Sequence, residues 1–185
     1  MAAALRGGAR VIQVRAKGLP AGALLALARE AVAAARAQGG VLIVNDRPDI
    51  ALLAGADGVH LGQEDLPPRD ARRTLPASTL LGLSTHDAGQ VEAAAGEPVD
   101  YIAIGPVFPT RTKADARPTV GLAGVRSARA RTRLPLVAIG GITADNARAV
   151  IEAGADGVAV LSAVLAGEDV EAAVRRLRAA AGDTG

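Results

Sequence analysis

Short apolar runs alternate with alanine-rich segments along the chain, and this alternation limits the folds open to it. Strands that are apolar throughout are buried on both faces, and helical crossovers between them are typical of a parallel sheet. An open doubly wound sheet and a closed (β/α) barrel both fit this pattern. The seven predicted strands cover residues 10–15, 41–45, 58–61, 79–83, 101–104, 136–139 and 157–160. The seven predicted helices cover residues 21–38, 49–53, 67–74, 87–95, 122–130, 144–153 and 170–181.

One internal repeat favours the barrel. Residues 54–59 read AGADGV and recur letter for letter at 153–158. Each copy ends a predicted helix and begins a predicted strand, so two βα units are built alike. A closed barrel needs eight strands, and the opening residues AAALRGGA read as the end of a helix. The prediction is therefore an α/β fold, a TIM (β/α)8 barrel over residues 1–185 as one domain, lacking its first strand and most of its first helix.

Composition excludes several classes of protein. The chain has no cysteine, which excludes disulfide scaffolds, cysteine-ligated zinc and thiol catalysis. Basic residues number 21 against 19 acidic ones, and Tyr101 and Phe108 are the only aromatic residues, so neither charge nor base stacking favours nucleic acid. No apolar stretch is long enough for a membrane span, and the N-terminus lacks the apolar region of a signal peptide. We therefore expect a cytoplasmic protein without nucleic-acid or membrane partners.

Polar residues gather where the predicted strands end. In (β/α) barrels the reacting groups lie at the carboxyl ends of the strands and in the loops that follow. The end of the first strand carries Gln13, Arg15 and Lys17, whose spacing of two points them to one side of an extended segment. Other polar residues at strand ends include Asn45, Asp46, Gln63, Asp65, Ser84, His86, Thr110, Arg111, Thr112, Lys113 and Ser162. A barrel would place nearly all of them on one rim.

Asp46 and Asp65, on neighbouring strand ends, are candidate metal ligands. Mg²⁺ takes one or two carboxylates and completes its shell with water and phosphate oxygens. The alternative is that each aspartate caps the following helix. Lysine occurs only twice, and Lys17 and Lys113 are predicted to converge with Arg15 on the same rim. A positive cluster beside Mg²⁺ fits a diphosphate better than a neutral ligand.

A second anion site is predicted near the end of the chain. Gly140 and Gly141 follow a strand and precede a helix, so their backbone can approach a phosphate, and the helix N-terminus favours negative charge. A tight turn would need the same glycines. Leu161 and Ser162 lie at the next strand end, and barrels often hold a phosphate in the loops after their last two strands.

The motifs at these strand ends resemble those of the thiamine-phosphate synthase family. The resembling segments are QVRAK (13–17), VNDRPDIA (44–51), DGVHLGQEDL (57–66), GLSTH (82–86), DY (100–101), GPVFPTRTK (105–113), AIGGI (138–142) and GVAVLS (157–162). They stand in order from about residue 4 to residue 181. The resemblance implies a TIM barrel that joins 4-amino-2-methyl-5-hydroxymethylpyrimidine diphosphate to a thiazole monophosphate and releases diphosphate.

The resemblance also implies roles for individual residues. Asp46 and Asp65 would bind Mg²⁺. The residues implied in catalysis are Arg15, Lys17, Ser84 and Lys113. Those implied for the pyrimidine diphosphate are Gln13, Val14, Arg15, Ala16, Lys17, Asn45, Ser84 and Lys113. Those implied for the thiazole phosphate are Thr110, Arg111, Thr112, Gly141, Leu161 and Ser162. Family members often self-associate, so a homo-oligomer is an expectation, although no segment marks an interface.

The chemistry leads to a dissociative hypothesis. The bond between carbon and the diphosphate oxygen breaks first and leaves a pyrimidine methylene cation, which the thiazole nitrogen then attacks. No protein nucleophile is needed, in keeping with the absence of cysteine. The enzyme would stabilise the departing charge with Mg²⁺, Arg15, Lys17 and Lys113 and hold the two substrates in line.

Two other functions stay open. His86 lies just beyond a strand end, and in the related thiazole tautomerases a histidine in this region transfers the proton, so a metal-free isomerase is one alternative. The presence of Asp46, Asp65 and Lys113 favours the synthase. The other alternative is a truncated, inactive barrel that acts as a binding module with exposed strand edges. His60, between two apolar residues, is expected to be a packed or hydrogen-bonded structural side chain.

Overall fold

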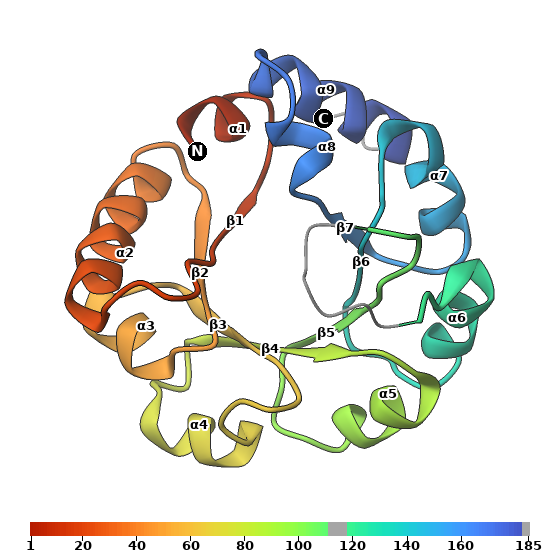
Figure 1. Cartoon of the computed structure of the whole chain (residues 1–185). Helices are drawn as coiled ribbons and strands as arrows, with labels where there is room; N and C mark the ends of the chain where they lie inside the picture. Colours follow the sequence, from red (N-terminus) through yellow and green to blue (C-terminus); the bar gives the residue numbers. More distant parts are fainter. Residues whose placement is uncertain (111–117, 183–185) are drawn as a thin grey trace.

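The computed structural model describes residues 1–110 and 118–182 of the chain. In these residues, seven parallel strands form one sheet in the order β1-β2-β3-β4-β5-β6-β7. The strands are β1 (Val11–Val14), β2 (Val41–Asn45), β3 (Gly58–Leu61), β4 (Leu80–Thr85), β5 (Tyr101–Ile104), β6 (Leu136–Ile139) and β7 (Gly157–Ala159). Figure 1 shows the sheet curled about a central axis, with β1 and β7 as its two edge strands.

Helices surround the sheet as an outer ring (Figure 1). They are α1 (Ala2–Arg6), α2 (Ala21–Arg36), α3 (Pro48–Ala54), α4 (Pro68–Thr74), α5 (Ala88–Ala95), α6 (Gly121–Arg129), α7 (Ala144–Glu152), α8 (Ser162–Leu165) and α9 (Val170–Ala181). In the part of the chain that the structure describes, none of these helices has the length and apolar character of a membrane span.

The core lies between the sheet and the helices. Val44 on β2 and Val59 on β3 are direct partners across the sheet, and both are fully buried. They belong to one apolar cluster with Ile50 and Ala51 of α3. β-branched residues fit such a pleated surface, whereas alanine lets the covering helices approach closely. This packing explains why the sequence alternates apolar strands with alanine-rich helices.

The repeated sequence AGADGV forms a specific connection between strands. Asp57 precedes β3, and its carboxylate accepts from the backbone N–H of Leu42 at 2.8 Å, while its own N–H donates to the Leu42 carbonyl at 3.0 Å. Asp156 precedes β7 and forms the same pair of bonds with Leu136, at 2.7 and 2.8 Å. In both units the aspartate therefore joins the start of one strand to the start of the strand before it.

The predicted fold class is confirmed, including the seven strands and the short opening helix. One predicted strand was too short: β4 continues through Ser84 and Thr85, which pair with Ala103 and Ile104 of β5. The Thr85 hydroxyl also donates to the Ala103 carbonyl at 2.9 Å. Polar side chains suggested a loop there, but tertiary pairing keeps the segment extended. The prediction also missed α8, a single turn too short to produce a periodic pattern.

Candidate functional site

The carboxyl ends of β1 to β4 bring several predicted pyrimidine-diphosphate residues to one rim. These four strands are consecutive neighbours in the sheet, so the loops after them are adjacent. The predicted residues whose polar side chains lie there are Gln13, Arg15, Lys17, Asn45 and Ser84. Val14 and Ala16 were also predicted to touch this substrate, but their side chains pack against the core. A contact from these two residues would therefore involve their backbone.

Asp46, the residue after β2, has a backbone conformation that is uncommon for a residue with a side chain. Its φ is 64°, and it is the only non-glycine residue with a positive φ among residues 1–110 and 118–182. Its N–H donates to the His60 carbonyl at 2.8 Å, which continues the pairing of β2 with β3. Aspartate tolerates this left-handed region better than most residues. Strained backbone of this kind is often found at functional sites.

The carboxyl groups of Asp46 and Asp65 come from different loops but lie close enough that Asp65 raises the pKa of Asp46. Burial, the hydrogen bond to Asp65 and the charge of Asp65 raise the pKa of Asp46 above its ordinary value. Lys17 and Arg15 act in the opposite direction, and Lys17 Nζ lies 3.6 Å from Asp46 Oδ2. Asp65 Oδ2 also accepts from the Gly62 N–H at 2.6 Å. Two carboxyl groups and two basic side chains are therefore gathered at one point of the rim.

Neither aspartate caps a helix, which was the alternative to metal binding. The residue at the N-cap of α3 is Arg47 and that of α4 is Pro67, and neither cap has a side-chain hydrogen bond. Among the described residues, no cluster of three or more histidine, aspartate or glutamate side chains suited to a metal is present. One or two carboxylates are nevertheless the usual protein contribution to a magnesium shell. The pair therefore fits an ion that completes its shell with water and substrate oxygens.

Ser84 is connected to the loop that carries Asp65. The Gln63 side chain donates to the Ser84 carbonyl at 2.7 Å, and Gln63 belongs to the same β3–α4 loop as Asp65. On its other side, the Ser84 hydroxyl lies 2.8 Å from Nε2 of His60. His60 is 7% exposed and hydrogen-bonded, as expected for a structural histidine.

Sequence reasoning assigned no role to Gln63 or Tyr101. Gln63 could have been noticed because it is a polar residue two positions before a predicted metal ligand. Tyr101 stood out as one of two aromatic residues in the chain, but its position in the sequence does not show which side chain it contacts. Its hydroxyl lies 2.9 Å from Nδ1 of His60.

His86, the histidine of the isomerase alternative, is bound to the neighbouring strand end. Its Nδ1 lies 2.6 Å from the Gly105 carbonyl, and its backbone N–H donates to the Gln90 side chain at 2.8 Å. Asp87 follows and caps α5 through the N–H of Gln90 at 2.8 Å. These contacts attach His86 to the strand end after β5 and to the first turns of α5.

Gly140 and Gly141, after β6, lie where another loop approaches closely. Their φ values are 97° and 66°. A Cβ at Gly141 would lie 2.7 Å from both the Cβ of Phe108 and the carbonyl oxygen of Pro109. The Phe108 N–H donates to the Gly140 carbonyl at 3.0 Å. Contact between the loops after β5 and β6 therefore requires both glycines, and phosphate binding at Gly141 stays a prediction.

The other predicted thiazole-phosphate residues are only partly described. Leu161 is the N-cap residue of α8 and Ser162 is its first residue, and both are exposed. Thr110 is half-buried. Arg111, Thr112 and Lys113 lie outside the described residues.

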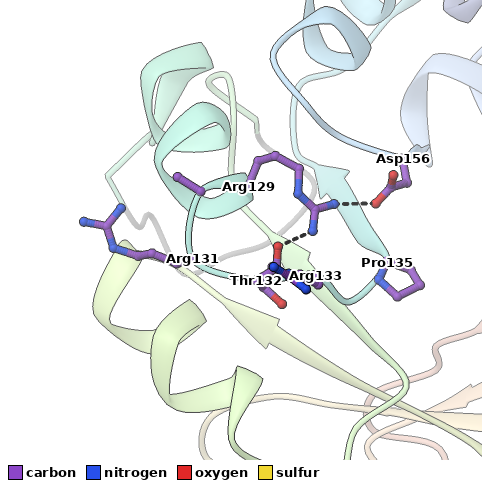
Figure 2. Close-up of a pocket in the computed structure, with 7 residues that line it drawn as sticks. Arg129, Arg131, Thr132, Arg133, Pro135 and Asp156 are labelled. Carbon is purple, nitrogen blue, oxygen red and sulfur yellow. Dashed lines mark hydrogen bonds and ion pairs between the residues drawn. The ribbon is translucent and has the colours of Figure 1, made fainter.

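An open hollow of about 840 Å³ lies away from these residues (Figure 2). It is at the opposite rim, because Pro135 directly precedes β6 and Asp156 directly precedes β7. Figure 2 shows Arg129 pointing to Asp156 and to the carbonyl of Thr132, and the distance to Asp156 is 2.8 Å. None of the predicted site residues lines this hollow. Arg129 connects the end of α6 to Asp156, the residue before β7.

Comparison with known proteins points to one family. The family model of thiamine monophosphate synthase matches residues 1–164. The thiamine-phosphate synthase of Moorella thermoacetica is 49% identical over 175 residues, 95% of this chain and 83% of the relative. That of Methanoculleus marisnigri is 52% identical over the same shares of the two chains.

Solved structures agree with the sequence matches. Thiamine phosphate pyrophosphorylase from Pyrococcus furiosus has a TM-score of 0.91 and 37% identity, covering 100% of this chain and 89% of that one. N-(5'-phosphoribosyl)anthranilate isomerase from the same organism has a TM-score of 0.71 at 14% identity, covering 99% of this chain and 93% of that one. This second likeness concerns the fold alone.

Proposed function

The chain belongs to the thiamine monophosphate synthase family, and from this premise we propose how its strand ends carry the reaction. Enzymes of this family are transferases that join a pyrimidine and a thiazole. The substrates proposed here are 4-amino-2-methyl-5-hydroxymethylpyrimidine diphosphate and a thiazole monophosphate. The bond from the methylene carbon to the diphosphate oxygen breaks, the thiazole nitrogen forms a bond to that carbon, and diphosphate leaves with the electron pair.

The gathering of Asp46, Asp65 and Lys17 at one point of the rim is the observation that supports this proposal best. Both residues follow apolar strands, and Lys17 lies 3.6 Å from Asp46. Such a site attracts a divalent cation through its carboxylates and a polyanion through its basic neighbours. A diphosphate bound to a metal satisfies both demands, whereas a neutral ligand satisfies neither.

Asp46 and Asp65 would hold Mg²⁺, which when bound neutralises charge on the diphosphate oxygens. The exposed side chains of Arg15 and Lys17 add positive charge where the leaving group departs. Lys17 is 62% exposed, so it can move from Asp46 to the diphosphate when substrate enters. Ser84 and Asn45, on β4 and β2, would donate or accept hydrogen bonds that orient the pyrimidine diphosphate. Lys113 is proposed to join them.

The thiazole phosphate would bind at the strand ends β6 and β7. Gly141 and the first turn of α7 lie after β6, and Leu161 and Ser162 lie after β7. Barrels of this class bind phosphate at these two loops. With Thr110, Arg111 and Thr112 from the preceding loop, they would hold the thiazole with its nitrogen facing the pyrimidine methylene carbon.

A direct assay tests the proposal. We expect the chain, with both substrates and MgCl₂, to form thiamine phosphate and diphosphate in equal amounts, measured by chromatography and a phosphate-release assay. Each substrate supplied alone is the control for hydrolysis. A correctly folded chain that releases diphosphate without joining the rings, or that makes no product, would contradict the proposed function.

A further inference from the structure

Three residues form a row across the sheet below the candidate site. His60 on β3 is the register partner of Gly82 on β4, and Gly82 is the partner of Tyr101 on β5. A Cβ at Gly82 would lie 2.1 Å from Cζ of Tyr101 and 2.4 Å from its hydroxyl oxygen. The tyrosine ring therefore lies across β4, in the space that glycine leaves, and reaches the strand beyond it.

From that position Tyr101 contacts His60 directly. The ring centroids are 5.4 Å apart with planes inclined by 29°, and the Tyr101 hydroxyl lies 2.9 Å from Nδ1 of His60. His60 is 7% exposed, so water competes little for this hydrogen bond. The imidazole of His60 is therefore held by a side chain that comes from two strands away.

The second imidazole nitrogen points to the candidate site. Nε2 of His60 lies 2.8 Å from Oγ of Ser84. Ser84 is two residues after Gly82 on β4, so its side chain is on the same face of the sheet and nearer the carboxyl end. Tyr101, His60 and Ser84 thus form a chain of hydrogen bonds that leads from the barrel interior to the rim.

The chemistry of the three groups decides the direction of these bonds. A neutral imidazole has one donor and one acceptor nitrogen. A phenol is a stronger donor than an aliphatic alcohol because it is more acidic, and burial raises the pKa of Tyr101 so that its proton is retained. A neutral His60 would then accept from Tyr101 at Nδ1 and carry its own proton on Nε2. The Nε2–H then donates to Ser84 Oγ, which leaves the hydrogen of the Ser84 hydroxyl available to another acceptor.

We propose that Tyr101 is a positioning residue that, through His60, orients the Ser84 hydroxyl as a hydrogen-bond donor to the pyrimidine diphosphate. Without the phenol, His60 can carry its proton on Nδ1 and accept from Ser84. The Ser84 hydroxyl would then donate its hydrogen bond to His60, and toward the substrate it could only accept one. This inference rests on the proposed function, because it assigns Ser84 to that substrate.

The test uses the full chain with Tyr101→Phe, which keeps the ring and removes the hydroxyl. We expect kcat/KM for the pyrimidine diphosphate to fall about tenfold, as for the loss of one hydrogen bond, while KM for the thiazole phosphate stays unchanged. Ser84→Ala should show at least the same loss, and the double variant should be no worse than Ser84→Ala. Thr85→Val is the matched control, since it also removes a hydroxyl from β4, but one that binds the Ala103 carbonyl rather than His60, so the tautomer of His60 should stay as in the wild type.

Nitrogen NMR of the ¹⁵N-labelled chain, which has two histidines, examines the hydrogen-bond chain without substrate. We expect His60 to be protonated at Nε2 in the wild type and partly at Nδ1 in Tyr101→Phe. A proton on Nδ1 in the wild type, an unchanged tautomer in the variant, or fully additive losses in the double variant would overturn the proposal. An inactive wild type would instead contradict the proposed function, and the tautomer measurement would still decide the orientation of His60.

Discussion

Aspartates at the two rims of the barrel differ in whether a second carboxyl group lies beside them. At the amino ends of the strands, Asp57, Asp100 and Asp156 each accept from a backbone N–H of the preceding strand, at 2.8, 2.7 and 2.7 Å. Arginines accompany two of them: Arg72 lies 2.6 Å from Asp100 and Arg129 lies 2.8 Å from Asp156. These carboxylates have donors, and two of them have a neutralising charge.

At the carboxyl ends, the negative charges are crowded together. Asp46 and Asp65 contact each other, and this contact together with burial raises the pKa of Asp46. The folded chain therefore disfavours the ionised form of Asp46. As pH rises from the pKa of the unfolded chain through the raised pKa of the folded chain, Asp46 lowers the free energy of unfolding. The same residue type therefore joins neighbouring strands at one rim and is crowded at the other, where we propose that it binds a cation.

The largest expected effect is a loss of kcat when the charge of Asp46 is removed. Asp46→Asn removes the charge and keeps the side-chain shape, and asparagine tolerates the positive φ at this position. We expect kcat to fall by about 10²- to 10³-fold, the usual cost of losing one preorganised electrostatic group. The melting temperature without metal should stay equal or rise, because a crowded charge is gone. Steady-state kinetics and thermal unfolding measure the two quantities.

Asp156→Asn is the matched control at the opposite rim, and its kcat should remain at the wild-type value. Loss of kcat in both variants would show that the effect is not specific to the crowded rim. Wild-type turnover in Asp46→Asn would remove the basis for a metal site there.

Magnesium addition should give the next largest effect. At a concentration about 100 times its dissociation constant, a ligand that binds only the folded chain adds about 2.7 kcal/mol of stability. We expect Mg²⁺ to raise the melting temperature of the wild type and of Asp156→Asn, but not that of Asp46→Asn or Asp65→Asn. Differential scanning fluorimetry over a MgCl₂ series measures this. An equal rise in all four proteins would place the bound ion elsewhere.

The smallest expected effect is a loss of stability in Asp156→Asn, at the rim opposite the candidate site. Asp156→Asn keeps an oxygen for the Leu136 N–H but loses the ion pair to Arg129. Because the Asp156 side chain is 56% exposed, solvent screening limits the cost to about 1 kcal/mol. Urea unfolding should show a lower midpoint with the same slope. A midpoint as high as that of the wild type would mean that this carboxylate contributes no stability.

Several features of the site were predictable because they depend on local order in the sequence. Parallel strands bring their carboxyl ends to one edge, so Asp46, Asp65 and Lys17 could be expected to meet. The row of His60, Gly82 and Tyr101 was not predictable, since it depends on the register of three strands separated by long helical crossovers.

The sequence by itself determined the order of strands and helices, the rim on which the polar residues gather, and the family. It did so because periodicity, glycine placement and strand-end motifs are local properties. Only the tertiary structure decided that Asp46 adopts a positive φ against Asp65, that Ser84 belongs to β4, and that Tyr101 reaches His60 across Gly82. Each of these depends on the pairing of neighbouring strands, and pairing energies act between residues far apart in the chain.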